Sequence, residues 1–384
     1  QNYVGSNNIN LLEPNGQFGT RIMGGGDAAS SRYIHTELNK LTQSIYPKED
    51  FPLLQYVEDD GLRVEPHYYV PIIPMVLVNG MTGIGTGFST NIPCFNPSDI
   101  CKNIRNILNE KEFTEMSPWF KGFNGSIIKT GDKTYLCKGC YKVLDAKTIE
   151  ITELPIGRWT EDYKEILNKM VIERGSKDSK GIIVDYENQS TDHSVYFKVY
   201  LKPGYLATAQ WSEGDIDKIE KDFKLTTTKQ TSLTNIHLYN ENNTITKYND
   251  VETIVRDYSK IRFNLYEKRK THQLNELDAQ ISLISSKCKF ILDIVEDRIV
   301  IHKQTKDKIK EQLVSMDYPL INESYDYLLK LPIYSLTKEE IDKLVKEKDD
   351  LVMKHETLSN LSVKDIWLSE LDVFEKEYCK FLKK

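Results

Sequence analysis

The adjacent residues Arg32 and Tyr33 are of types that could act together on a phosphate group. A tyrosine hydroxyl becomes a nucleophile when a neighbouring group withdraws its proton, and the planar guanidinium of an arginine matches phosphate oxygens in pairs. The pair follows a run of mostly small residues, 24–31, which leaves the backbone free to approach a bulky ligand. The alternative is a tyrosine that is simply packed, since the chain holds 22 of them.

Ile84 is a second candidate, because Gly83 and Gly85 flank it and Gly87 follows. Glycines on both sides leave the isoleucine on a thin ridge that could enter a groove. The alternative is a glycine turn around a core isoleucine. The residues alone leave both interpretations open.

Two groups of residues have side chains that could bind a metal ion. Residues 58–60 are three adjacent carboxylates, but a glycine follows them, which is typical of a solvated turn. Cys137 and Cys140 form a CxxC pair, but a tetrahedral zinc site needs two further soft ligands, and the sequence has no second CxxC or nearby HxxxH. We therefore predict two reduced thiols on a pair of strands and no metal site in this chain.

The chain has 384 residues and a formal net charge of −6, with a pI near 5.8. This length is enough for two or three domains with cores of their own. The negative charge is the wrong sign for a protein that coats nucleic acid non-specifically, so any such contact must come from local clusters. The sequence has no long apolar run and no signal-peptide pattern, which predicts a soluble protein with no membrane partner.

Short elements are expected around the two candidates. Periodicity predicts a helix from residue 35 or 36 to about 45, ended by Pro47, and a short strand over 51–57. Residues 63–93 should be tight, buried and irregular, because their prolines forbid a long helix. Further on, we expect a helix over 97–110, mostly strands and turns over 120–211, and one helix over about 160–173.

Long helices are expected from residue 251 onward. Apolar residues step by three and four in two seams, 251–265 and 274–295, which are out of phase. This slip predicts a stutter or a local break in the coil. The same spacing returns over 341–381, so one helix should go out, a small tip should turn the chain and a second helix should return. The tip is more apolar than a free tip should be, which predicts self-association.

Several long stretches resemble the breakage-reunion region of type IIA DNA topoisomerases of the eukaryotic type. They are QNYVGSNNINLLEPNGQFGTR (1–21), SRYIHT (31–36), RVEPHYYVPIIPMVLVNGMTGIGTGFSTNIP (63–93), GFNGSI (122–127), IEITELPIGRWT (149–160) and LTTTKQTSLT (225–234). These stretches follow the family's order with family-like spacing, so the resemblance covers essentially the whole chain. It implies a breakage-reunion core that cuts one DNA duplex, passes a second duplex through the break and reseals it.

The resemblance assigns roles to the candidate residues. Tyr33 would be the nucleophile that forms a 5′-phosphotyrosine bond, and Arg32 would neutralise charge on the phosphate in the transition state. Ile84 would be the wedge that enters the duplex between base pairs and bends it. The other implied DNA-binding residues are Gln17, Thr20, Arg21, Gln230 and Ser232.

The implied fold is α+β and multidomain. Residues 1–66 would be the C-terminal part of a winged-helix domain with the nucleophile loop, and residues 67–248 an α/β tower domain. A long antiparallel coiled coil would follow, with an outgoing helix over 249–299, a small helical dimerisation tip over 300–336 and the end of the tip with the returning helix over 337–384. Because a double-strand break needs two tyrosines and the chain has one such motif, a two-fold homodimer on double-stranded DNA is expected.

The resemblance also implies Mg²⁺ and ATP as cofactors, both bound by upstream domains absent from this chain. We therefore expect a fragment that is inactive alone. Ser31 stands where cellular enzymes usually have proline, Thr82 replaces an acidic residue, and the added glycine in 23–26 is expected to loosen the nucleophile loop. These departures suggest a divergent member from a large cytoplasmic DNA virus. The expected location is the nucleus for a cellular protein and the host cytoplasm for a viral one.

Two alternatives remain at this stage. One is a non-catalytic coiled-coil DNA clamp, in which Tyr33 is merely packed and forms no covalent adduct. The other is the separate cleavage protein of a bacterial-type enzyme, against which the eukaryotic-like segments QFGTR and QTSLT argue.

Overall fold

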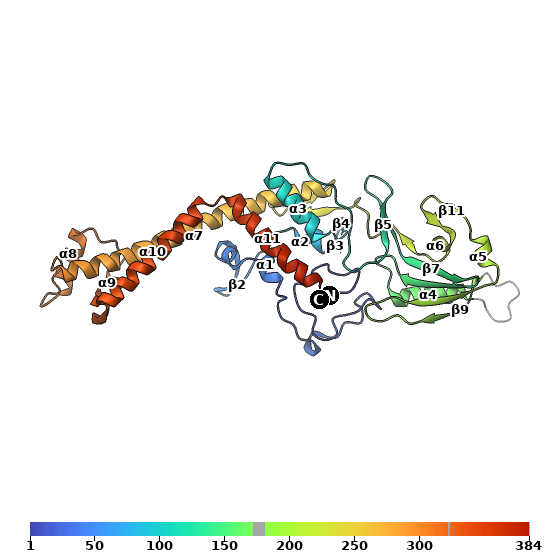
Figure 1. The fold of residues 1–384 in the computed structure, drawn as a ribbon, viewed down its shortest axis with the longest axis horizontal. Helices are drawn as coiled ribbons and strands as arrows, with labels where there is room; N and C mark the ends of the chain where they lie inside the picture. The colour runs from blue at the N-terminus through green and yellow to red at the C-terminus, as the bar shows by residue number, and fades with distance from the viewer. Residues whose placement is uncertain (172–180, 322, 384) are drawn as a thin grey trace. The chain divides into compact units, whose positions relative to one another are not determined.

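The computed structural model describes residues 1–171, 181–321 and 323–383. It contains both helices and antiparallel sheets, which confirms the predicted α+β class (Figure 1). Contacts between residues divide the chain into two compact units. The first comprises Gln1–Arg262 with Glu370–Lys384, and the second comprises Phe263–Ser369. The five predicted segments are a finer division than this one and stay a prediction.

The first 66 residues are mostly loops with short elements. The elements are the 3-10 turn η1 (Ser31–Tyr33), helix α1 (Thr42–Ile45), the 3-10 helix η2 (Lys48–Leu53) and the hairpin of β1 (Tyr56–Asp59) and β2 (Leu62–Pro66). Asp60 and Gly61 have positive φ values of 48° and 76° at the hairpin turn. The three carboxylates of 58–60 lie at this turn, and Asp59 and Asp60 are exposed, in agreement with the predicted solvated turn.

Two predictions for this segment are wrong. The helix covers only Thr42–Ile45, because His35 and Leu38 form antiparallel bridges with Asn15 and Leu12. A pairing partner distant in sequence therefore overrides the helical spacing of the apolar residues. The predicted strand over 51–57 begins only at residue 56, since residues 48–53 form η2.

Residues 71–78 are largely buried, as predicted, and helix α2 (Met75–Val78) begins directly after Pro74. The prediction of buried, irregular structure is wrong for residues 81–92, which are mostly exposed and regular, and the predicted burial is wrong for residues 63–69, of which only Pro66 is buried. Strands β3 (Met81–Ile84) and β4 (Ser89–Ile92) form an antiparallel hairpin with Met81 opposite Ile92 and Ile84 opposite Ser89. Helix α3 (Pro97–Leu108) follows as predicted, and the Asn96 side chain caps its N-terminus by accepting a hydrogen bond from the Ser98 N–H.

The predicted region of strands contains two antiparallel sheets. The larger has the strand order β7 (Cys140–Asp145), β8 (Thr148–Glu153), β10 (Phe197–Leu201) and β9 (Ile183–Asn188), and the smaller the order β13 (Thr226–Thr227), β6 (Tyr135–Lys138) and β5 (Ser126–Lys129). Helix α4 (Thr160–Met170) buries Tyr163 and Leu167 in one core with Phe197 of the larger sheet. The last residues predicted for this helix, 172–173, lie outside the described residues.

Four short elements and a hairpin complete this part of the chain. They are α5 (Tyr205–Thr208), β11 (Ser212–Glu213), β12 (Ile216–Asp217), α6 (Lys218–Asp222), β14 (His237–Tyr239) and β15 (Ile245–Lys247), the last two forming the hairpin. Cys137 lies in β6 and Cys140 begins β7, so the two thiols lie on successive strands of different sheets, and both are free. Burial raises the pKa of Cys137 to about 11, which keeps this thiol protonated at neutral pH.

Helix α7 (Val251–Val295) enters the second unit without interruption, so the break predicted for the outgoing helix is not found there. The returning side is interrupted instead, between α10 (Lys338–Asn360) and α11 (Val363–Leu382). Lys270, which lies in the slip between the two seams, donates hydrogen bonds from Nζ to the backbone oxygens of Ser359 (2.9 Å) and Leu361 (2.7 Å) at that interruption. The returning helix therefore accommodates the change of phase.

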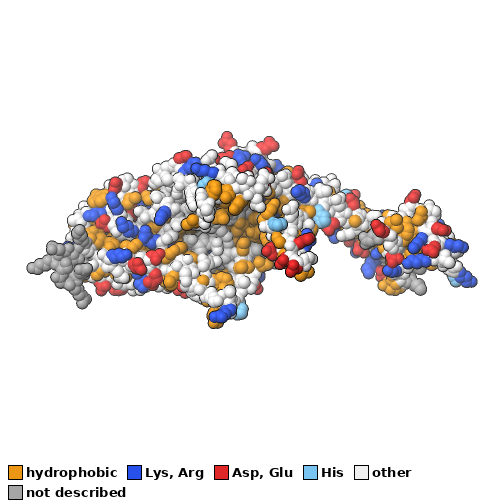
Figure 2. Space-filling model, turned by 180° about the vertical axis from the view of Figure 1, so that it is seen from behind, with side chains coloured by type: hydrophobic (Ala, Val, Ile, Leu, Met, Phe, Trp, Pro, Cys, Tyr) orange, Lys and Arg blue, Asp and Glu red, His pale blue; other side chains and the backbone are white. Residues whose placement is uncertain are grey.

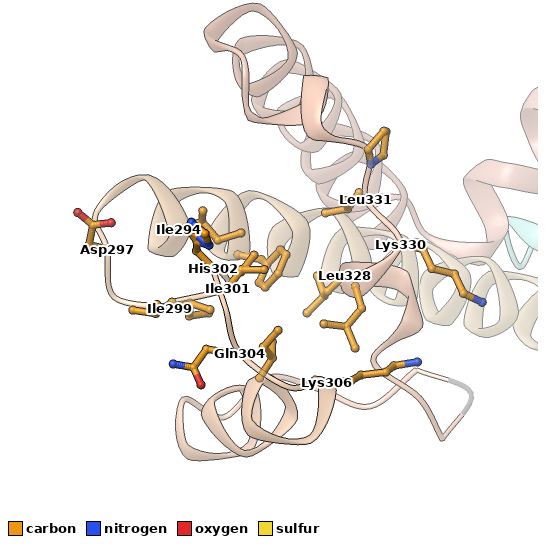
Figure 3. A pocket seen from close by; sticks show the side chains of 15 residues that line it. Ile294, Asp297, Ile299, Ile301, His302, Gln304, Lys306, Leu328, Lys330 and Leu331 are labelled. Atoms are coloured by element: carbon orange, nitrogen blue, oxygen red, sulfur yellow. The ribbon is translucent and has the colours of Figure 1, made fainter.

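The tip of the second unit contains α8 (Lys306–Ser315), α9 (Asp326–Leu329) and the 3-10 helix η3 (Ile333–Leu336). Its core is formed by Phe290, Ile299, Leu313, Tyr318, Tyr325 and Leu328. A pocket of about 810 Å³ opens beside this core and is lined mainly by apolar side chains, including Ile301 and Leu331 (Figure 3). Among the described residues, no helix is both long and apolar enough to cross a lipid bilayer.

Candidate active site

Tyr33 lies at the end of η1, and its side chain is 68% exposed. The turn has no buried residue, and its backbone is closed by a hydrogen bond from the Tyr33 N–H to the Ser30 oxygen (2.9 Å). The guanidinium carbon of Arg32 lies 5.0 Å from the centre of the Tyr33 ring. Arg32 is exposed and forms no ion pair with another described residue, so its N–H groups are available to an anion beside the phenol.

A carboxylate that the sequence analysis did not single out organises the loop before this turn. Asp27 accepts hydrogen bonds from the Thr20 N–H (2.8 Å), the Thr20 hydroxyl (2.6 Å) and the Gln17 side-chain amide (2.9 Å). Partial desolvation acts to raise the pKa of Asp27, but these hydrogen bonds outweigh it, so the pKa lies below its ordinary value. Asp27 is therefore ionised at neutral pH, and the predicted DNA-binding residues Gln17 and Thr20 already have an anionic partner.

Arg21 does not lie where a DNA-binding residue should. Its side chain is 4% exposed, and its guanidinium pairs with the buried carboxylate of Glu153 at the end of β8. Glu153 also accepts hydrogen bonds from the backbone N–H groups of Asn124 and Leu154. The predicted phosphate contact of Arg21 is corrected accordingly: a buried, paired guanidinium supports the fold and is not available to DNA in this structure.

The glycines of the loop permit a close approach that any side chain would prevent. Gly24 has a positive φ of 58°, and a Cβ there would lie 2.3 Å from the indole ring of Trp159. Gly25 has a φ of 85°, and its Cβ would lie 2.4 Å from the side-chain nitrogen of Gln1. Gly26 has no positive φ and only one neighbour in tight contact. Two of the three glycines are therefore required by the local packing.

The Ile84 side chain is 93% exposed at the end of β3, on the β3–β4 hairpin. This exposure excludes the core isoleucine and agrees with a projecting ridge. A second hairpin, β14–β15, supports the first: the His237 N–H donates to the Thr90 hydroxyl (3.2 Å), and the His237 ring lies 5.8 Å from that of Phe88. Exposed apolar side chains of both hairpins line a pocket of about 260 Å³, among them Met81, Phe88, Tyr239 and Ile245.

Gln230 and Ser232 lie on the segment that joins the smaller sheet to the second hairpin. Both are partly exposed, whereas Thr231 between them is buried and donates from its hydroxyl to the Tyr135 oxygen (2.7 Å). Asn91 of β4 holds both ends of this segment, because its side chain donates to the Lys229 oxygen (3.0 Å) and its N–H to the Asn235 oxygen (2.8 Å). The structure therefore places these two residues next to the hairpin of Ile84.

The charges around these elements are mixed. On the face shown in Figure 2, basic and acidic side chains are interspersed where charges gather, and hydrophobic and uncharged atoms cover much of the rest. No group of three His, Cys, Asp or Glu side chains that could hold a metal ion occurs within the part of the chain that the structure describes. The residues present therefore do not fit a Mg²⁺ site of their own, and no step below is routed through a metal.

The sequence matches, over residues 1–372, the family model for the A subunit of DNA gyrase/topoisomerase IV. The chain belongs to this family. It is 37% identical to DNA topoisomerase 2 of Saccharomyces cerevisiae, with 100% of this chain and 30% of the relative covered. It is 36% identical to DNA topoisomerase 2 of Acanthamoeba polyphaga mimivirus, with 98% of this chain and 34% of the relative covered.

A solved structure agrees with this assignment. The crystal structure of the Plasmodium falciparum topoisomerase II DNA-binding, cleavage and re-ligation domain matches with a TM-score of 0.86 at 36% identity. The match covers 100% of this chain and 54% of that chain. The predicted resemblance to type IIA topoisomerases is thereby confirmed, although the chain spans only about a third of the curated relatives named above.

Within this chain, the structure groups most of the predicted residues at two places. Gln17, Thr20, Arg32 and Tyr33 lie on one loop system, and Ile84 lies with Gln230 and Ser232 beside the paired hairpins. Sequence reasoning missed Asp27 and Trp159. Asp27 was visible as the one carboxylate in a run of small residues, and Trp159 belongs to a stretch that resembles the family, but neither signal names a contact.

Proposed function

We propose that this chain is the DNA breakage-reunion core of a type II DNA topoisomerase. The observation that carries the proposal is the exposed Tyr33 phenol beside the exposed Arg32 guanidinium, in a chain of the topoisomerase family. The Tyr33 oxygen attacks a backbone phosphorus, a new P–O bond forms, and the bond to the 3′ oxygen breaks. The phenol releases its proton to solvent, the 3′ oxygen takes up a proton as it leaves, and the 5′ phosphate remains on Tyr33.

Resealing is the reverse reaction. The free 3′ hydroxyl attacks the phosphotyrosine, and Tyr33 leaves. Because the phosphodiester energy is stored in the protein–DNA bond, this step needs no external energy. Arg32 acts in both directions by stabilising the charge that accumulates on the non-bridging phosphate oxygens. Ile84 supports the proposal as the wedge, since an almost fully exposed isoleucine on a hairpin can enter a base step and bend the duplex.

Covalent capture tests the nucleophile. The full-length protein, as wild type and as Tyr33→Phe, is incubated with Mg²⁺ and duplex DNA labelled at its 3′ ends, which stay on the protein-linked strands, and stopped with detergent. We expect a DNA-linked protein for the wild type and none for the variant. If the variant still forms the adduct, another tyrosine is the nucleophile. If neither forms it, while both bind DNA with a salt-dependent affinity, the protein is a non-catalytic clamp.

We infer further that the protein acts as a two-fold homodimer on double-stranded DNA, with the tip of the second unit as one contact between copies. The tip carries large apolar side chains that are 41–66% exposed: Val300, Ile301, Val314, Leu320 and Tyr334. Patches of this kind commonly mark interfaces. Ile301→Asp with Val314→Asp should shift the second unit's self-association toward monomer in analytical ultracentrifugation, whereas Lys308→Asp, also exposed on α8, should not.

The cofactors and the location complete the proposal. Mg²⁺ and ATP are proposed for the full-length protein, held by residues outside this chain, as the resemblance to type IIA topoisomerases implies. Removing Mg²⁺ with EDTA should abolish adduct formation without abolishing DNA binding. We place the protein in the nucleus if its source is cellular and in the host cytoplasm if its source is a large cytoplasmic DNA virus, which fluorescence microscopy of the tagged protein would distinguish.

A further inference from the structure

The segment that presents Tyr33 is tied at both ends to one short stretch of chain. The Ala29 N–H donates to the Gln17 oxygen (2.9 Å), and the His35 N–H donates to the Asn15 oxygen (3.0 Å). Residues 29–35 therefore form a loop whose two ends are hydrogen-bonded to residues that lie only two positions apart in the sequence. Any shift of residues 15–17 therefore moves both ends of this loop, and with them the turn that carries Tyr33. The position of the nucleophile thus depends on what holds residues 15–17.

Asp27 holds that stretch from inside the loop. Its carboxylate binds the side chain of Gln17 and two donors of Thr20, as described above, which closes the loop from residue 17 to residue 27. The Gly25 N–H donates to the Thr20 oxygen (3.0 Å) within the same loop, and Gly19 and Gly25 touch so closely that a Cβ on Gly19 would lie 2.6 Å from the Gly25 Cα. A charged acceptor that receives several hydrogen bonds is a strong local constraint.

Three contacts with residues 153–161 hold the same loop from outside, and a fourth comes from Gln1, whose side-chain amide donates to the Phe18 oxygen (2.9 Å). The Arg21 guanidinium pairs with Glu153, and the Glu161 N–H donates to the Ile22 oxygen (3.0 Å). Gly24 lies against the indole of Trp159, which also contacts the Tyr3 ring at a ring-centre distance of 5.7 Å and an interplanar angle of 83°. The first three partners, Glu153, Trp159 and Glu161, lie at the end of β8 and the start of α4. The loop therefore rests on the sheet region of the first unit.

We propose that Asp27 and Trp159 are positioning residues for Tyr33. Asp27 closes the loop of residues 17–27, which adjoins the residues that anchor both ends of the Tyr33 segment. Trp159 supports that loop through Gly24. This inference rests on the proposed function of Tyr33. It also changes the expected role of Gln17 and Thr20, which act on the reaction through Asp27 and not by direct contact with phosphate. Neither Asp27 nor Trp159 touches the reacting atoms.

The consequence is a separation between binding and chemistry. Loss of a positioning residue leaves DNA affinity nearly intact, because the β3–β4 hairpin that carries Ile84 and the nearby residues Gln230 and Ser232 are unchanged. It lowers the rate of cleavage of the bound DNA, because a misplacement of about 1 Å at a reacting atom can cost on the order of 100-fold in rate. A purely structural role would instead lower the unfolding temperature and leave the cleavage rate per folded, bound complex unchanged.

The test uses the full-length protein with Mg²⁺, as wild type, Asp27→Asn and Trp159→Ala. DNA affinity is measured by fluorescence anisotropy in a Tyr33→Phe background, and single-turnover cleavage is measured at saturating DNA. We expect affinities within about 3-fold of wild type and cleavage slowed by roughly 10- to 100-fold. Asp192→Asn and Trp211→Phe are the matched controls, since both side chains are exposed and lie in other parts of the first unit. Both controls should cleave at the wild-type rate.

A double-mutant cycle tests the contact between Trp159 and Gly24. Gly24→Ala places a Cβ in the space of the indole, so it should slow cleavage, and part of that loss should disappear when Trp159→Ala removes the ring. The loss that remains is the cost of alanine at a positive φ.

Three outcomes overturn the inference. Folded Asp27→Asn and Trp159→Ala variants could cleave at the wild-type rate. Asp27→Asn could weaken DNA binding while cleavage at saturation stays normal, which would return Gln17 and Thr20 to direct phosphate contact. The effects of Gly24→Ala and Trp159→Ala on the cleavage rate could be strictly additive, which would show that Trp159 does not act through Gly24. Absence of any adduct in the wild type is a different result, because it contradicts the proposed function itself.

Discussion

The turn that carries Tyr33 and the hairpin that carries Ile84 both expose a large side chain, but they are held in different ways. The Tyr33 turn has no buried residue and no regular ladder, and its position is set by hydrogen bonds to a carboxylate and by the close contact of Gly24 with an indole. The Ile84 hairpin has a regular antiparallel register and a second hairpin beside it.

This difference matches what each side chain has to do. A nucleophile must lie within a fraction of an ångström of its reacting atom, which requires several converging constraints. A wedge only has to project from a stiff support, which two paired strands provide. The nucleophile loop should therefore be sensitive to small changes at a distance, and the hairpin should tolerate them. The predictions below test this contrast, beginning with the largest expected effect.

Arg21→Ala should destabilise the fold by about 3–5 kcal/mol, because it leaves the Glu153 carboxylate buried without its cation. The measurement is the free energy of unfolding from urea titration. Arg32→Ala is the matched control, since Arg32 is exposed and unpaired among the described residues, and it should change stability by no more than about 0.5 kcal/mol. Equal effects of the two substitutions would contradict the distinction between a structural and a functional arginine.

Arg32→Ala should instead lower the rate of DNA cleavage by roughly 10²- to 10³-fold, as expected when one group that stabilises transition-state charge is removed. Single-turnover cleavage at saturating DNA measures this effect. Arg32→Lys should restore part of the rate, because the charge returns without the paired geometry. A normal rate for Arg32→Ala would mean that another cation serves the phosphate.

Ile84→Ala should leave the unfolding free energy unchanged within about 0.5 kcal/mol, since the side chain is 93% exposed. It should reduce the bend of a doubly labelled duplex, measured by energy transfer, and slow cleavage by about tenfold, because less of the unstacking energy is supplied. Tyr33→Phe should keep the full bend. If Ile84→Ala bends DNA normally, the wedge assignment is wrong.

His237→Ala should have a smaller effect, about 0.5–1.5 kcal/mol in stability, because the lost ring contacts Phe88 and donates a hydrogen bond to the Ser89 oxygen through Nδ1 alone. Its Nδ1 lies 2.9 Å from the Ser89 oxygen, so hydrogen exchange at the ends of the β3–β4 hairpin should quicken. Exchange in residues 17–29 should not change. Faster exchange in both places would show that the two regions are coupled.

The stabilisation that comes from the hydrogen bonds to the Asp27 carboxylate should depend on pH only in acid. The pKa of Asp27 is lowered in the folded protein, so its contribution to stability is fully present above the unfolded value of about 4 and is lost as pH falls through the folded value. The stability difference between wild type and Asp27→Asn should therefore be constant from about pH 6 to 8 and shrink below about pH 4. A difference that shrinks near neutral pH would show that another group titrates.

Part of this architecture could be predicted from local patterns. Helix α3 follows from its proline-led start and apolar spacing, and the turn at Asp60-Gly61 follows from its residue types. The extended segment at His35 and Leu38 could not be predicted in this way, because its partners, Asn15 and Leu12, lie far upstream. Local periodicity describes which face a helix would bury, but it does not show that another segment of the chain offers hydrogen bonds that compete with the helix.

The sequence by itself determined the family, the identity of Tyr33 and Arg32 as the candidate reactive pair, and Ile84 as the candidate projecting residue, because these depend on residue types in collinear motifs. Only the tertiary structure decided what each charge faces. The sequence alone does not distinguish Arg21 from Arg32, two arginines of neighbouring loops. In the structure, Arg21 is buried against Glu153 and Arg32 is open to solvent. Burial and pairing depend on chain segments that meet only in the fold, and these decide whether a charge supports the structure or the chemistry.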